Sequence, residues 1–127
     1  MVTMSKTRGF TLIELLIVMT ILALLVSIAA PRYFRNIDKT KEAVLREDLF
    51  TMRSTLDKFY EDTGKYPDSL QELVDRRYLR NIPADPMTGS DKTWVIVPPD
   101  DPKKGGIFNV RSGSKDKARD GTFFSDW

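Results

Sequence analysis

A single carboxylate interrupts the most apolar part of this sequence. Glu14 is the only charged residue in the run FTLIELLIVMTILALLVSIAA, which occupies residues 10–30. A charged side chain inside a bilayer costs several kcal/mol unless it is paired or neutralised. Glu14 therefore predicts a function in which another group compensates its charge.

A second group of acids lies in the C-terminal segment RSGSKDKARDGTFFSDW, residues 111–127. Asp116, Asp120 and Asp126 carry three carboxylates, and main-chain carbonyls can add to them to give the roughly six to eight oxygen ligands that Ca²⁺ takes. Binding of Ca²⁺ would stabilise a loop that has little apolar content. The alternative is a solvated loop whose acids pair loosely with the basic residues between them.

Most side chains that enzymes use as bases or nucleophiles are missing. The chain has no His and no Cys, which excludes imidazole bases, disulfides and thiolate metal sites. Ser112 and Ser114 beside Lys115 come nearest to a nucleophile with a base, but no recognisable motif surrounds them. We predict that the chain is not an enzyme. With 20 basic and 18 acidic residues it shows no strongly basic face, so we expect no nucleic-acid binding.

The apolar run is long enough to cross a membrane. Its 21 residues, at about 1.5 Å per helical residue, span the roughly 30 Å hydrocarbon core of a bilayer. The short basic stretch before it is expected to stay in the cytoplasm. Two other interpretations are a secretory signal peptide, with residues 27–30 partly resembling its cleavage site, and a plain membrane anchor. A secretory signal peptide has a shorter apolar run than the one found here. A plain membrane anchor leaves Glu14 unexplained.

The segment around the start of the apolar run resembles a known signal. Residues 6–14, KTRGFTLIE, are similar to the class III signal of type IV pilins and type II secretion pseudopilins. This resemblance implies that a prepilin peptidase cuts between Gly9 and Phe10 and methylates the new amine of Phe10. It also implies that the ammonium group of an adjacent subunit compensates Glu14 during assembly. Pro31 matches a proline at which the helix of the family bends or locally melts in filaments.

An amphipathic helix is predicted to follow Pro31. Apolar residues recur at steps of four and three, which is typical of one buried helix face: Leu45, Leu49, Met52, Leu56 and Phe59. Gly64 is a natural helix stop, and Glu42 with Arg46 is a possible i,i+4 pair. We therefore expect one helix from about Phe10 to Asp62. The predicted division is a cleaved leader at 1–9, a transmembrane and filament-core helix at 10–31, and a periplasmic domain at 32–127.

The rest of the chain predicts small elements. Asp68 or Ser69 can cap a short helix that ends near Leu79. Residues 93–97 and 107–110 are strand candidates, joined by a loop rich in Pro, Asp, Lys and Gly. The expected fold class is α+β, with a long N-terminal helix packed on a small antiparallel sheet, as in type IV pilins.

A further resemblance, to the major pseudopilins of type II secretion systems, is carried by Tyr60-x-Asp62-x-Gly64-x-Tyr66-Pro67 and by Pro83-x-Asp85-Pro86. It implies a structural subunit that polymerises through its N-terminal helix and drives protein export. The implied location is the bacterial inner membrane, crossed once, with the C-terminal domain in the periplasm. The implied partners are copies of the chain, prepilin peptidase, other pseudopilins, an inner-membrane assembly platform and, before assembly, membrane lipid.

The same resemblance implies Ca²⁺ in the C-terminal loop. Asp116 matches a family element there, whereas Asp120 and Asp126 do not fall squarely on the later acids. The alternative function is a major or minor subunit of a type IV pilus, for adhesion, motility or DNA uptake. Small size and the lack of Cys favour the secretion system.

Overall fold

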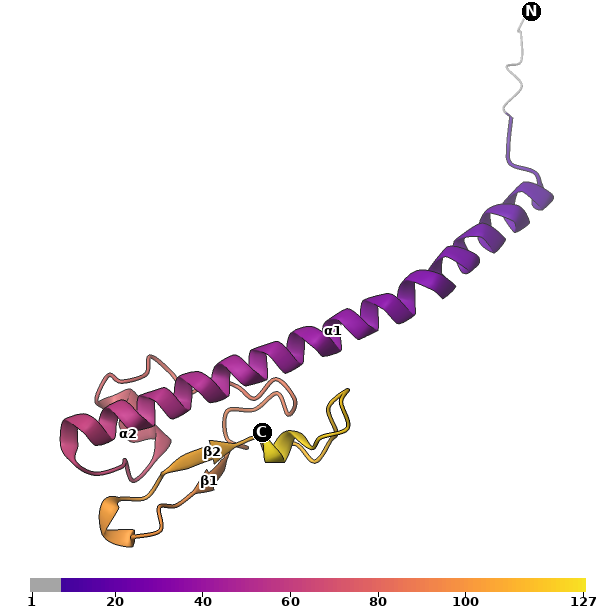
Figure 1. Cartoon of the computed structure of the whole chain (residues 1–127). Coiled ribbons are helices and arrows are strands. Elements are labelled where there is room, and N and C mark those ends of the chain that lie inside the picture. Colours follow the sequence, from indigo (N-terminus) through magenta and orange to yellow (C-terminus); the bar gives the residue numbers. More distant parts are fainter. Residues whose placement is uncertain (1–7) are drawn as a thin grey trace, which may run out of the picture. The chain divides into compact units, whose positions relative to one another are not determined.

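The computed structural model describes residues 8–127, so residues 1–7 of the predicted leader lie outside the described part. The elements along the chain are α1 (Leu12–Thr63), α2 (Leu70–Asp75), β1 (Val95–Val97), η1 (Pro102–Lys104), β2 (Asn109–Arg111) and η2 (Phe124–Asp126) (Figure 1). Two compact units divide between Asp38 and Lys39. The predicted boundary at Pro31 concerns the end of a membrane span, and it stays a prediction.

The long helix α1 confirms the expectation of one helix to within two residues at either end. It continues through Pro31, although proline offers no N–H to the carbonyl of Ser27 one turn earlier. It stops at Thr63 because Gly64 adopts a φ of 75° while its N–H donates to the carbonyl of Tyr60 at 2.8 Å. Bending or melting at Pro31 in a filament stays a prediction.

The second half of α1 supplies one wall of the hydrophobic core. The predicted apolar face is buried along its length: Leu45, Leu49, Met52, Leu56 and Phe59. Side chains from the rest of the second unit complete the core, including Leu73, Trp94, Ile107, Val110 and Phe124. Each fully buried side chain of this size contributes about 1.5–3 kcal/mol relative to exposure, so this half of the helix holds the unit together.

The short helix α2 ends earlier than predicted. Ser69 caps it, as expected, by accepting the N–H of Glu72 on its hydroxyl. The helix stops at Asp75 because Arg77 takes a left-handed φ of 65°, and the next two N–H groups both donate to the carbonyl of Leu73. The predicted end near Leu79 is therefore wrong.

The small sheet pairs β1 with β2 in antiparallel register, with Ile96 opposite Val110. Both strands are shorter than predicted, and β2 extends one residue further, to Arg111. Two such strands would be marginal alone, so the sheet depends on the core, into which Val110 is fully buried. The long helix and this sheet confirm the expected α+β fold.

Candidate functional site

The predicted cleavage junction lies just outside α1. Gly9 and Phe10 have no helical structure, and the Phe10 side chain is 90% exposed. A Cβ built on Gly9 would meet nothing within 4 Å, and its φ is not in the left-handed region. The fold of the chain therefore does not itself require glycine at this position.

Glu14 has a partner within its own chain that the sequence reasoning missed. Its N–H donates to Thr11 Oγ1 at 3.2 Å, and its carboxylate Oε2 accepts the N–H of Thr11 at 3.1 Å. This reciprocal pair is a capping box, which satisfies two of the N–H groups left open at a helix start. The Thr-x-x-Glu spacing was the signal that could have revealed it.

The first part of α1 presents apolar side chains on every side. Its large apolar residues from Leu12 to Ile28 are all exposed. By length and composition, α1 qualifies as a helix that could cross a membrane, the one such helix in the described residues. A helix that is apolar all round needs lipid or other protein around it, because water solvates apolar side chains poorly.

The predicted Ca²⁺ ligands do not come together. Within residues 8–127 there is no group of three acidic side chains that could hold a metal ion. The carboxylate of Asp120 accepts from the N–H and the hydroxyl of Thr122, at 3.0 and 2.6 Å. Asp126 shares a groove with Asp120 and Asp57, but Arg46 and Arg53 line the same groove and offset much of their negative charge. In the described part of the chain, the three aspartates therefore do not form a common ligand set.

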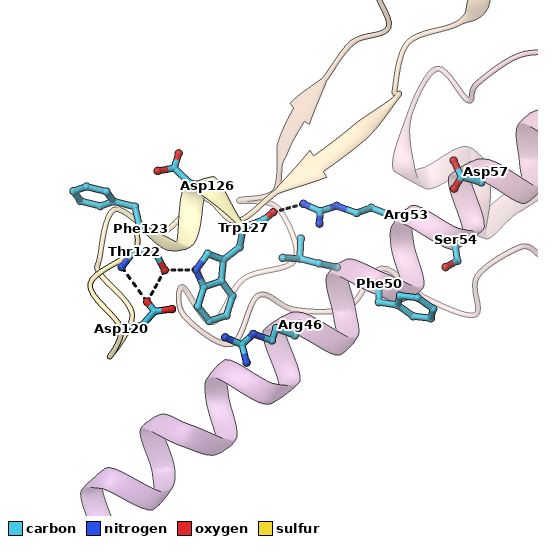
Figure 2. A pocket seen from close by; sticks show the side chains of 11 residues that line it. Arg46, Phe50, Arg53, Ser54, Asp57, Asp120, Thr122, Phe123, Asp126 and Trp127 are labelled. Atoms are coloured by element: carbon cyan, nitrogen blue, oxygen red, sulfur yellow. Dashed lines mark hydrogen bonds between the residues drawn. The ribbon is translucent and has the colours of Figure 1, made fainter.

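The groove lies between α1 and the C-terminal segment, with a volume of about 720 Å³ (Figure 2). Trp127 stands in its wall, donating from its indole N–H to Thr122 Oγ1 at 2.8 Å. The guanidinium of Arg46 lies 4.5 Å from the centre of the indole ring. The predicted pairing of Arg46 with Glu42 is not formed, because Glu42 pairs with Arg119.

Glu42 forms a salt bridge with Arg119, whose own side chain is half exposed. Glu42 is 5% exposed, and its carboxylate accepts the main-chain N–H of Arg119 at 2.9 Å and the guanidinium Nε at 3.0 Å. The hydrogen bond from the Arg119 side chain lowers the pKa of Glu42, against the opposing effect of burial. Sequence reasoning missed this contact because the two residues are 77 positions apart.

The serines considered as nucleophiles serve the fold instead. Ser112 is fully buried and donates its hydroxyl proton to Asp85 Oδ2 at 2.6 Å. Its oxygen accepts the N–H of Ser114, whose own hydroxyl oxygen accepts the N–H of Asp116. Lys115 is exposed and takes no part in these contacts. Both hydroxyl groups are therefore engaged in hydrogen bonds within the domain.

The comparisons with known proteins agree on one kind of protein. The family described as the prokaryotic N-terminal methylation motif matches residues 4–30. The type II secretion system core protein G of Klebsiella pneumoniae is 33% identical over 104 residues, which cover 69% of this chain and 74% of that protein. The protein of the same name from Escherichia coli is 28% identical over 128 residues, which cover 88% of this chain and 84% of that protein. No solved structure matches this chain.

These likenesses cover both halves of the molecule. The methylation motif includes Gly9, Phe10 and Glu14, and the relatives extend the match well beyond the apolar helix into the second unit. The α+β fold, with its long helix and small antiparallel sheet, agrees with them. This chain therefore belongs to the type II secretion system core protein G family, the pseudopilins among the type IV pilin-like proteins.

Proposed function

We propose that this chain is a structural subunit of a type II secretion pseudopilus. Prepilin peptidase cuts it between Gly9 and Phe10 and methylates the amine of Phe10, and the processed subunits polymerise through α1 to drive protein export. Before assembly the chain sits in lipid of the inner membrane, with its C-terminal domain in the periplasm. Its partners are copies of itself, other pseudopilins and the assembly platform in that membrane.

The observation that carries this proposal is the exposed apolar half of α1, which begins directly after an accessible Gly9–Phe10 junction. Cleavage there creates an ammonium group beside the helix start. Glu14, which caps its own helix in the single subunit, can then meet the ammonium group of a neighbouring copy. Processing thus supplies the positive charge that a carboxylate within an apolar filament core requires.

The test is expression of the full chain in a bacterium with and without prepilin peptidase. With the peptidase, intact mass should show loss of residues 1–9 and one added methyl group, and filaments should appear in the sheared fraction. A Gly9→Leu variant should remain uncleaved and unassembled, although its fold is unchanged because the Gly9 environment is open. Filaments built from uncleaved chains would contradict the proposal.

The names of the relatives favour the secretion pseudopilus over the type IV pilus, because they are type II secretion proteins. A strain lacking its core protein G separates the two functions. Expression of this chain there, with its cognate secretion genes, should restore export of a secreted enzyme. Restoration of twitching motility or DNA uptake in a pilin-deficient strain, without export, would instead support the pilus.

A further inference from the structure

We propose that the C-terminal loop of this chain, residues 112–127, is closed onto the domain by protein contacts and needs no Ca²⁺. The main contact is the pairing of the Glu42 carboxylate with the main-chain and side-chain nitrogens of Arg119, which we call the clasp. Two smaller sets of contacts hold the beginning and the end of the loop. Together these three sets of contacts hold the loop along its length.

The clasp holds the middle of the loop. Burying a carboxylate without partners is costly, so the near-complete burial of Glu42 indicates that its partners are formed in the folded state. It accepts a main-chain N–H as well as the guanidinium, with the salt-bridge distance to Arg119 Nη2 at 3.0 Å. A main-chain donor fixes the loop backbone directly, which a flexible side-chain contact alone cannot do.

The beginning of the loop is fixed by a buried acid that faces inward. Asp85 is 0% exposed, and its two oxygens accept the N–H of Met87 at 2.8 Å and the hydroxyl of Ser112 at 2.6 Å. The next residue, Gly113, passes so close to Thr93 that a Cβ would collide with the Thr93 carbonyl oxygen. The loop therefore leaves β2 along a path that the rest of the domain determines.

The end of the loop is fixed by Arg53 of α1. Its guanidinium donates to Asn109 Oδ1 at 2.7 Å and to the carbonyl of Val110 at 3.1 Å. It also donates to the main-chain oxygen of Trp127 at 2.6 Å (Figure 2). One side chain thus joins the helix, β2 and the loop end. The Trp127 ring packs at 5.0 Å from Phe124, which is in the core.

The aspartates that remain are poorly suited to bind a cation together. Asp116 does not line the groove that holds Asp120 and Asp126, and one carboxylate oxygen of Asp120 already accepts from Thr122. The groove lined by Asp57, Asp120 and Asp126 also contains two guanidinium groups, which offset much of the negative charge (Figure 2). The Ca²⁺ site implied by the family resemblance therefore does not fit the donors that this chain places here. If the proposed function holds, assembly of the filament is independent of Ca²⁺ as well.

The test is thermal unfolding of the full chain in detergent micelles, followed by near-ultraviolet circular dichroism of Trp94 and Trp127. The melting temperature should be equal, within about 1 °C, in excess CaCl₂ and in excess EGTA. A ligand at about a hundred times its Kd would raise it by about 10 °C or more in a domain of this size. A rise of that kind, abolished by Asp116→Asn or Asp120→Asn, would overturn the proposal.

Variants of the clasp test its role independently of calcium. Glu42→Ala removes both contacts and should lower the melting temperature by about 10 °C, whereas Arg119→Ala keeps the main-chain donor and should lower it by about half as much. Glu47→Gln is the matched control, because Glu47 is exposed on the same helix, and it should change the melting temperature by less than about 1 °C. If Glu42→Ala behaves like Glu47→Gln, the clasp does not hold the loop.

Limited proteolysis keeps the test decisive if Glu42→Ala unfolds entirely. In Arg119→Ala the loop should be cut faster than in the wild type, while the protection of α2 is unchanged. Cleavage at Gly9 and filament yield are measured in the same cells, with and without EGTA. Loss of cleavage in the wild type would refute the proposed function but not the calcium-independent closure of the loop. Filaments that require Ca²⁺ would refute calcium independence but not the proposed function.

Discussion

Two glutamates on α1 differ in whether their hydrogen-bond partners are local or distant in the sequence. Glu14 is exposed and bonds only locally, to Thr11, so its carboxylate can exchange that partner for one on another subunit. Glu42 is buried and bonds to a residue far along the chain, so its partner changes only if the loop opens. The two residues have the same type and charge, and their different burial determines whether the carboxylate can change its hydrogen-bond partner.

Glu14 should be needed for assembly rather than for cleavage. Glu14→Gln keeps a side chain able to cap the helix but removes the negative charge, so cleavage should persist while sheared filaments fall at least about tenfold. Thr11→Ala, which weakens the cap by about 1 kcal/mol and keeps the charge, is the matched comparison. Immunoblots of sheared and cellular fractions give both results. Normal filaments from Glu14→Gln would show that the charge is not used.

The clasp should make stability fall in acid. The folded-state pKa of Glu42 is lowered by Arg119, with a smaller contribution from the charge of Arg46. The folded state therefore favours the carboxylate, and this stabilisation is complete above the unfolded pKa of about 4.3 and is lost as the pH falls through the lower folded value. Denaturant titrations from pH 6 to pH 3 (about one point per half unit) should show a smaller loss for Glu42→Gln than for the wild type. Equal slopes would contradict the assignment.

At the scale of elements, local patterns were predictable and distant contacts were not. The apolar stripe, the stop at Gly64 and the cap at Ser69 follow from spacing and residue type, and the structure confirms all three. The left-handed Arg77 ended α2 early, and no rule of composition favours arginine in that conformation. The partner of Glu42 could not be found either, because spacing along a helix suggests Arg46 and only the folded loop presents Arg119.

Two left-handed positions should respond in opposite ways to substitution. Gly64→Ala places a Cβ at a φ of 75° with no steric neighbour, so it should cost about 1 kcal/mol through backbone strain alone. Arg77→Gly removes such strain at a φ of 65°, and should be neutral or stabilising by up to about 1 kcal/mol. Urea unfolding of the full chain in micelles measures both. Destabilisation by Arg77→Gly beyond about 1 kcal/mol would show that its side chain has an additional role.

At the scale of the whole molecule, α1 carries two surfaces with different needs. From Leu45 to Phe59 one face is buried in the domain, whereas from Leu12 to Ile28 the apolar side chains are exposed all round. Stability of the folded domain depends on the first surface. The capacity to enter lipid and then a filament depends on the second.

Substitutions of leucine on the two surfaces should therefore have separate effects. Leu56 is fully buried, so Leu56→Ala should destabilise the domain by about 2–5 kcal/mol. Leu22 is half-exposed and outside the domain core, so Leu22→Ala should leave the unfolding transition unchanged and reduce the yield of filaments. Circular dichroism and shearing assays on the same two variants measure the two effects. A large change in unfolding for Leu22→Ala would contradict this separation.

The contacts of Arg119 and Trp127 with α1 also determine when this domain can fold during synthesis. They join residues 77 and 74 positions apart, so the helix cannot complete the covering of its apolar face until almost all of the domain has been translated. Contacts of such long sequence separation slow folding, because a large loop must close before they are gained. Until then the face of α1 that is buried in the folded domain stays exposed to chaperones and proteases. Protein quality control would therefore act on a newly made subunit mainly before the last part of its chain arrives.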